Sequence, residues 1–194
     1  NRNISAKFPG KTTICEDLQT NEYLTKDEGG GGAHFGSQWD AGFVHPVRDV
    51  IEQPDDNSRN MDKIVGALNL KYNGDAFDRV IYTESHDEIA NGKSRVPSEI
   101  NPDDPTDVYA RQRSSLGAGL VMTTPGIPML FQGQEFLQGG WFQDTEPLDW
   151  YLKDEFAGIV KLYRDLIRLR LNRDGFSAGL TGQHVTVHHV NQAL

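Results

Sequence analysis

Residues 79–88 have the sequence RVIYTESHDE, and this stretch decides the fold class. Its first half is apolar and β-branched, which is typical of a buried strand, and its second half changes at once to polar side chains. Two other stretches repeat the pattern, TTICED at 12–17 and IPMLFQGQE at 127–135. We therefore predict three strands that end in polar residues, over 12–15, 79–83 and 127–131.

Helical segments separate these strands. The clearest is 61–68, where Met61, Ile64, Val65 and Leu68 recur at i, i+3, i+4 and i+7. Further helices are predicted over 44–51, 106–123 and 156–174. Loops are predicted around the four glycines at 29–32 and over 90–105 and 132–150, and a last strand over 184–190. Because strands that alternate with helices form right-handed βαβ units, the sheet is expected to be parallel.

Two α/β architectures fit this order, an open doubly wound sheet and a (β/α)8 TIM barrel. Both place chemistry at the carboxyl ends of the strands, and long loops after successive strands favour the barrel. The chain offers three or four strand–helix units, about half of the eight that a closed barrel needs. We therefore expect about half of such a barrel.

Composition limits the classes of partner. The net charge of −9 over 194 residues repels nucleic acid and anionic membranes, so a neutral partner such as a glucan is favoured. No apolar run approaches the roughly 20 residues of a membrane span, and the first residues contain no signal-peptide core. A single cysteine, Cys15, excludes an internal disulfide and suits a reducing compartment, so cytoplasm is the default location.

Glu16 and Asp87 are the residues that the pattern singles out for catalysis, because each is a carboxylate placed directly after an apolar parallel strand. Two carboxyl groups about 5 Å apart suit retaining glycoside chemistry. The plainer reading is that strand ends favour Asp and Glu because they are solvated. His86 could donate a hydrogen bond to a sugar hydroxyl, and the rings of Trp39 and Trp141 could stack on glucose units, although aromatic residues are equally common in cores.

Two other motifs carry no function. Gly92-Lys93-Ser94 imitates the end of a phosphate-binding loop, but Asp87 stands where that motif needs a glycine. His184 and His188 suggest a metal site, but on a strand they lie roughly 13 Å apart, too far to share an ion.

Taken together, the three strand ends resemble the signatures of the α-amylase superfamily, glycoside hydrolase family 13. TICEDL at 13–18 resembles the fifth-strand motif, YTESHDE at 82–88 the seventh and MLFQGQEF at 129–136 the eighth. The likeness covers about residues 10–170, and the ESHD version followed by GKS is more like branching enzymes than secreted amylases. It implies the C-terminal half of a (β/α)8 TIM barrel over residues 1–174, with the barrel exit and the possible start of a β domain over 175–194.

The resemblance implies a role for each site residue. Glu16 is the general acid/base, Asp87 stabilises the transition state, and His86 contacts the glucose hydroxyls. It implies 1,4-α-glucan branching, in which an α-1,4-glucan segment passes to a 6-hydroxyl, with glycogen, starch or a maltooligosaccharide as the partner. Hydrolysis of the amylase or trehalose-releasing type and a non-catalytic glucan-binding scaffold remain alternatives. No cofactor or metal is expected, since no Asp/Asn cluster has a calcium-loop spacing.

The chain departs from the family pattern at one point. The nucleophilic aspartate belongs to a fourth-strand motif upstream of Glu16, and nothing in residues 1–15 matches it. We therefore expect this chain alone to be inactive. A half barrel also exposes two strand edges, so self-association or pairing with the missing half is expected.

Overall fold

Four short parallel strands lie side by side in the order in which they occur in the sequence. The computed structural model describes residues 1–192. The strands are β1 (Ile14–Cys15), β2 (Ser37–Trp39), β3 (Arg79–Ile81) and β4 (Ile127–Pro128). The register pairs Cys15 with Gln38, Trp39 with Val80, and Ile81 with Pro128. All four strands therefore end on one edge of the sheet.

Seven α-helices and six 3-10 turns occur in the described residues, 1–192. The helices are α1 (Arg2–Lys7), α2 (Ala41–Ile51), α3 (Met61–Asn69), α4 (Val96–Ile100), α5 (Val108–Thr123), α6 (Leu152–Glu155) and α7 (Ala157–Arg170). The 3-10 turns are Glu22–Leu24, Glu28–Gly30, Asp56–Ser58, Ala76–Asp78, Gln134–Phe136 and Ala178–Leu180. None of the described helices is both long and apolar enough to span a membrane.

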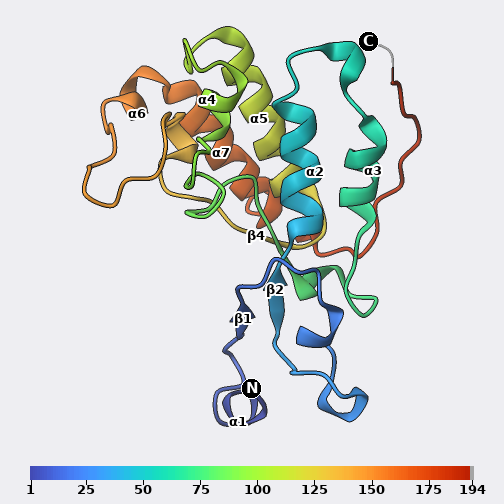
Figure 1. The fold of residues 1–194 in the computed structure, drawn as a ribbon. Coiled ribbons are helices and arrows are strands. Elements are labelled where there is room, and N and C mark those ends of the chain that lie inside the picture. Colours follow the sequence, from blue (N-terminus) through green and yellow to red (C-terminus); the bar gives the residue numbers. More distant parts are fainter. Residues whose placement is uncertain (193–194) are drawn as a thin grey trace.

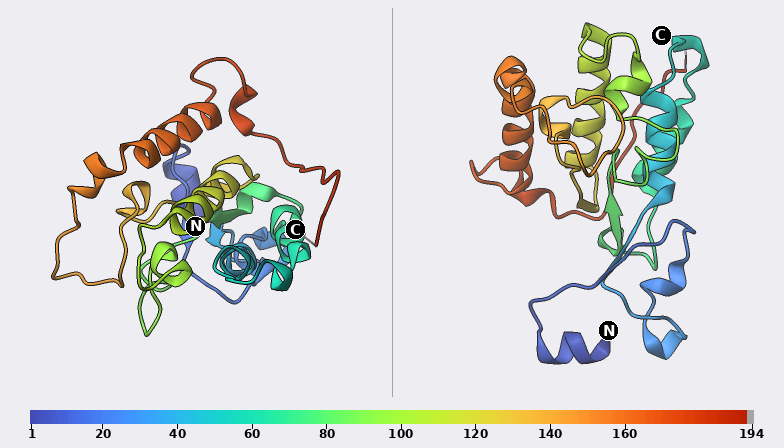
Figure 2. Two further views of the ribbon diagram at one scale, coloured as in Figure 1. Left: turned by 90° about the horizontal axis from the view of Figure 1, so that it is seen from above. Right: turned by 60° about the vertical axis from the view of Figure 1, so that its left-hand side comes forward.

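The larger helices form a row in the order α3, α2, α5 and α7. Helix α3 packs on α2, α2 on α5, and α5 on α7, as Figures 1 and 2 show. Side chains at the helix starts satisfy free backbone N–H groups: Asp40 caps α2, Asn60 caps α3 and Asp107 caps α5. Residues 1–36 project away from this helical row (Figure 1).

The helix predictions over 44–51, 61–68, 106–123 and 156–174 are confirmed in place, with α7 ending at Arg170. The loop prediction over 90–105 is wrong at 96–100, where α4 forms. Its proline, Pro97, lies in the first turn, where a missing N–H costs nothing. Helix α4 then brings Val96 and Ile100 into the core.

The strands differ from the prediction in two places. Strand β2 was not predicted, because Ser37 and Gln38 are polar, yet both are fully buried. Residues 184–190 form no strand. They run as an extended segment beside α3, where Gln192 accepts a hydrogen bond from the Met61 N–H at 3.0 Å. The apolar alternation of this segment has no neighbouring strand to pair with.

The main core lies between β3 and the helices on one side of the sheet. Phe43 and Val47 of α2, Ile81 of β3 and Val121 of α5 are buried together. Burial of each such side chain contributes about 1.5–3 kcal/mol. Strand β3 is therefore the best-fixed strand, and the loop that follows it starts from a rigid base.

Candidate functional site at the strand ends

Three side chains from the ends of β1 and β3 meet at the rim of the sheet. The Nε2 atom of His86 lies 3.5 Å from Oε1 of Glu16 and 3.4 Å from Oδ1 of Asp87. One oxygen or nitrogen of each residue lies within 4.8 Å of those of the other two. All three side chains are about half exposed. The structure thus brings together the residues that the strand-end pattern singled out, although 70 positions separate Glu16 from His86.

Aromatic rings surround the imidazole of His86. The ring of Trp39, at the end of β2, lies edge-on to His86 at 5.9 Å between centroids, and Tyr82 lies 5.3 Å from Trp39. On the other side Phe142 lies 6.5 Å from His86, and Phe131 supports Phe142 at 5.7 Å. Trp39 therefore lies where sequence reasoning placed it, beside the candidate carboxylates.

Trp141 has a different position. Its side chain is 59% exposed and lines a neighbouring cavity of about 250 Å³, together with Arg95, Gln132 and Glu146. Phe142, the next residue, is the one whose ring lies beside His86, and its backbone N–H donates to the carbonyl of Ile89 at 2.9 Å. The sequence placed both rings in this loop but contained no signal for which one turns inward.

Buried charges support the loop after β3, and sequence reasoning missed them. Glu84 is fully buried and accepts the Val96 N–H at 2.8 Å, and Arg95 lies 3.4 Å from its other oxygen. Burial raises the pKa of Glu84, and the positive charge of Arg95 opposes that rise. Burial likewise lowers the pKa of Arg95. The local sequence contained no signal that separates these buried charges from solvated ones.

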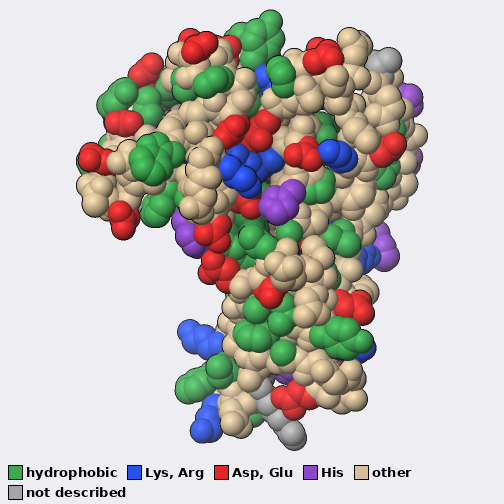
Figure 3. Space-filling view, viewed as in Figure 1, with side chains coloured by type: hydrophobic (Ala, Val, Ile, Leu, Met, Phe, Trp, Pro, Cys, Tyr) green, Lys and Arg blue, Asp and Glu red, His purple; other side chains and the backbone are tan. Residues whose placement is uncertain are grey.

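Glu88, directly after Asp87, is a second buried carboxylate in that loop. It is 2% exposed, and His45 of α2 lies 2.9 Å away, with Lys93 at 3.4 Å. Figure 3 shows histidine and acidic side chains adjacent to one another at the narrow waist between the helices and the N-terminal segment. The half-exposed trio of Glu16, His86 and Asp87 is thus backed by paired, buried groups.

The arrangement suits chemistry on a neutral, polyhydroxylated ligand. The carboxylates of Glu16 and Asp87 have oxygens within 4.8 Å of one another, so both can act on one ligand. An imidazole between them can hydrogen-bond to a hydroxyl, and rings nearby can cover the apolar face of a sugar. Among residues 1–192 this trio is also the one group of three His, Cys, Asp or Glu side chains close enough to share a cation.

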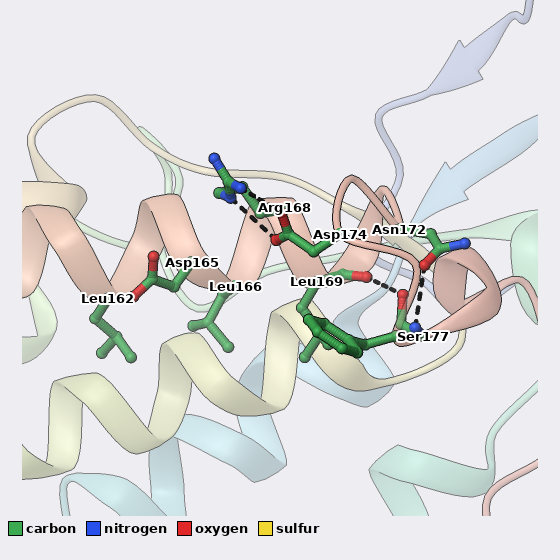
Figure 4. A pocket seen from close by; sticks show the side chains of 9 residues that line it. Leu162, Asp165, Leu166, Arg168, Leu169, Asn172, Asp174 and Ser177 are labelled. Carbon is green, nitrogen blue, oxygen red and sulfur yellow. Dashed lines mark hydrogen bonds and ion pairs between the residues drawn. The ribbon is translucent and has the colours of Figure 1, made fainter.

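A separate cavity of about 320 Å³ lies on α7, away from the strand ends (Figure 4). Its polar groups pair with one another. Arg168 binds Asp174, and Asn172 accepts the Ser177 N–H at 3.1 Å. These contacts fasten the turn after α7 and leave little polar chemistry for a ligand.

Comparisons with known proteins agree with the motifs. A 1,4-alpha-glucan branching enzyme GlgB of Paramagnetospirillum magneticum is 30% identical over 169 residues, which cover 86% of this chain and 22% of that protein. The enzyme of the same name from Kitasatospora aureofaciens is 29% identical over 87% of this chain and 22% of that protein. That of Geobacillus stearothermophilus is 28% identical, covering 100% of this chain and 30% of that protein.

No family model matches the chain. The similarity to the branching enzymes nevertheless extends over most of the chain, and for the Geobacillus stearothermophilus enzyme over all of it. The chain is therefore identified as a relative of the 1,4-alpha-glucan branching enzymes of the α-amylase superfamily, and it spans less than a third of the length of the three relatives named here.

Proposed function

We propose that this chain supplies part of the active site of a retaining 1,4-α-glucan branching enzyme. The observation that carries the proposal is the meeting of Glu16, His86 and Asp87 within 4.8 Å at the ends of β1 and β3. The names of its relatives support glucan as the substrate.

The fold that we propose is the C-terminal half of a (β/α)8 barrel, over residues 1–174, with residues 175–194 leaving it. Two observations support this. The strands follow one another in space without the reversal of order found in doubly wound sheets. Strand β2 also lies between the strands that carry the fifth-strand and seventh-strand motifs, in the place of a sixth.

The proposed reaction divides the work among the site residues. Glu16, as a carboxylic acid, protonates the glycosidic oxygen while the bond from that oxygen to the anomeric carbon breaks. A nucleophilic carboxylate from outside these residues takes the anomeric carbon. Asp87 stabilises the positive charge of the transition state, and His86 holds the hydroxyls of that glucose.

In the second step the roles reverse. Glu16, now a carboxylate, removes the proton from the 6-hydroxyl of an acceptor glucan as that oxygen attacks the anomeric carbon. The bond to the nucleophile breaks, and an α-1,6 branch forms. Trp39 and Trp141 are proposed to stack on neighbouring glucose units.

The test is Glu16→Gln in the longer protein that contains this chain. We expect kcat to fall by at least about 10³-fold, with glucan binding nearly unchanged, because an amide keeps the shape of the side chain but cannot exchange a proton. Glu155→Gln, at the exposed end of α6, is the matched control and is expected to be neutral.

The readouts are the iodine absorbance of amylose and the count of α-1,6 linkages after debranching. Equal rates for wild type and Glu16→Gln would exclude the catalytic assignment and favour a glucan-binding scaffold. Activity that yields only shorter linear chains would support the catalytic roles of these residues but would show that the acceptor is water, not a glucan 6-hydroxyl.

A further inference from the structure

The loop after β3 and the loop after β4 are fastened to one another at several points. Here the β3 loop is residues 82–98 and the β4 loop is residues 129–150. The Phe142 N–H donates to the Ile89 carbonyl at 2.9 Å, and the Arg95 N–H donates to the Gly140 carbonyl at 2.8 Å. Two side-chain bonds add to these, from the Gly140 N–H to Ser98 Oγ at 2.8 Å and from Gln134 Nε2 to Thr83 Oγ1 at 2.6 Å.

Arg95 lies at the centre of this junction. Its side chain is 3% exposed, and Nη1 lies 2.8 Å from the carbonyl oxygen of Gln132 and 3.4 Å from Oε2 of Glu84. Its guanidinium also lies over the ring of Phe131, at 5.1 Å from the centroid. One side chain thus contacts both loops at once.

Arg95 is connected to the candidate site in two ways. The first is along the chain, because Glu84, its ion-pair partner, stands two residues before His86. Through the rings, Phe131 supports Phe142 at 5.7 Å, and Phe142 faces His86 at 6.5 Å. Displacement of Arg95 would therefore disturb His86 both from its own loop and from the ring beside it.

We propose that Arg95, held by Glu84, is a positioning residue that locks the β3 loop to the β4 loop and so fixes His86 and Asp87 relative to Glu16. An arginine suits this place because Nη1 carries two protons, one for the carboxylate of Glu84 and one for the carbonyl of Gln132, while the planar guanidinium covers the ring of Phe131. The compact ammonium of a lysine can donate to oxygens but has no planar face to stack on the ring.

The first test needs no activity and uses the 194-residue chain. Amide hydrogen exchange is measured for wild type, Arg95→Met and Arg95→Lys. We expect the Phe142 and Gly140 amides to exchange about tenfold faster or more in Arg95→Met, and to an intermediate degree in Arg95→Lys. Should Arg95→Met fail to fold, Arg95→Lys decides the question by itself.

Arg170→Met is the matched control. Arg170 is also a partly buried arginine that donates to backbone carbonyls, those of Met122 at 2.9 Å and Thr124 at 3.0 Å, but it lies at the opposite end of β4. Its loss should leave the exchange of Phe142 and Gly140 unchanged. Unchanged exchange of these amides in both Arg95 variants would overturn the proposal.

The second test rests on the proposed function and uses the longer protein. A misplacement of about 1 Å can cost roughly 10²-fold in rate, so Arg95→Met is expected to lower kcat by about that factor with a KM within about threefold of wild type. Arg95→Lys should recover part of kcat, and Arg170→Met should keep it. Faster exchange with an unchanged kcat would overturn the positioning role, whereas an inactive wild type would instead overturn the proposed function.

Discussion

An arginine opens the central strand β3 at position 79, and its whole side chain is buried. Nη1 of Arg79 lies 3.2 Å from Oδ2 of Asp40, which is equally buried, and the Tyr72 hydroxyl donates to the same carboxylate at 2.9 Å. Arg79 also donates to the Ala67 carbonyl at 2.8 Å. Burial raises the pKa of Asp40, and Arg79 opposes that rise. This pair joins the start of α2 to β3.

Removal of one partner of this pair is expected to be costly. Arg79→Met leaves the Asp40 carboxylate buried without its cation, so we expect the free energy of unfolding to fall by about 3–5 kcal/mol. The matched control is Lys63→Met. Lys63 pairs with Asp49 at 2.8 Å, but both side chains are 45% exposed or more, so its loss should cost at most about 1 kcal/mol. Urea unfolding of both variants measures the difference, and equal losses would contradict the assignment.

The difference between buried and exposed side chains also explains which site residues could be predicted from the sequence. Glu16, His86 and Asp87 were predictable, because polar residues that follow an apolar strand lie at its rim. Trp39 was predicted only as a ring in or beside a strand-end loop, since β2, the strand that carries it, was not predicted. Arg95 was not, because its importance depends on contacts with a loop 37 positions away, at Gln132. No local pattern distinguishes such a buried arginine from a solvated one.

At the scale of elements, apolar periodicity predicted α3 and α7, and the helices α2 and α5 were also predicted, but β2 was not. A helix carries its signal over two or more turns, whereas β2 has three residues and buries two polar ones. The segment 184–190 is the opposite case, since it alternates like a strand but forms none. Strand formation depends on a partner strand, and the sequence of one segment does not contain that information.

Helix α2 ends at a glutamate whose protonation should affect stability. Glu52 is its C-cap residue, and burial raises the pKa of this carboxyl to about 7, with further increases from the negative charges of Glu99 and Glu84. Nη2 of Arg48, 2.9 Å away, opposes the rise. The folded protein therefore binds more protons than the unfolded chain between about pH 4.5 and 7. The contribution of Glu52 to stability is present below that window and is lost as the pH rises through it.

Glu52→Gln is expected to remove this pH dependence. The difference in unfolding free energy between wild type and variant should change by up to about 3 kcal/mol across the window, with wild type losing stability as the pH rises. The free energy of unfolding is measured with denaturant at a series of pH values between 4 and 8, spaced by about half a pH unit. Glu155→Gln, an exposed control, should follow wild type. Parallel curves for wild type and Glu52→Gln would contradict the prediction.

At the scale of the whole molecule, the parallel direction of the strands is the feature that the sequence predicted best. Alternating strands and helices implied a parallel sheet, and all three pairs of neighbouring strands are parallel. Closure into a barrel is a property of all eight strands, so it stays a proposal for a chain with four in its described part, residues 1–192. Self-association through the open edges likewise stays a prediction.

The activity of the 194-residue chain alone follows from the make-up of its site. The trio contains two carboxylates, and the resemblance implies a third, the nucleophile, from a strand that these residues do not supply. We therefore expect amylose incubated with this chain to keep its iodine absorbance, whereas the longer protein should lower it. Glu16→Gln in the longer protein is the matched negative control. Clear activity of the chain alone would contradict this prediction and would mean that Glu16 and Asp87 suffice without the implied nucleophile.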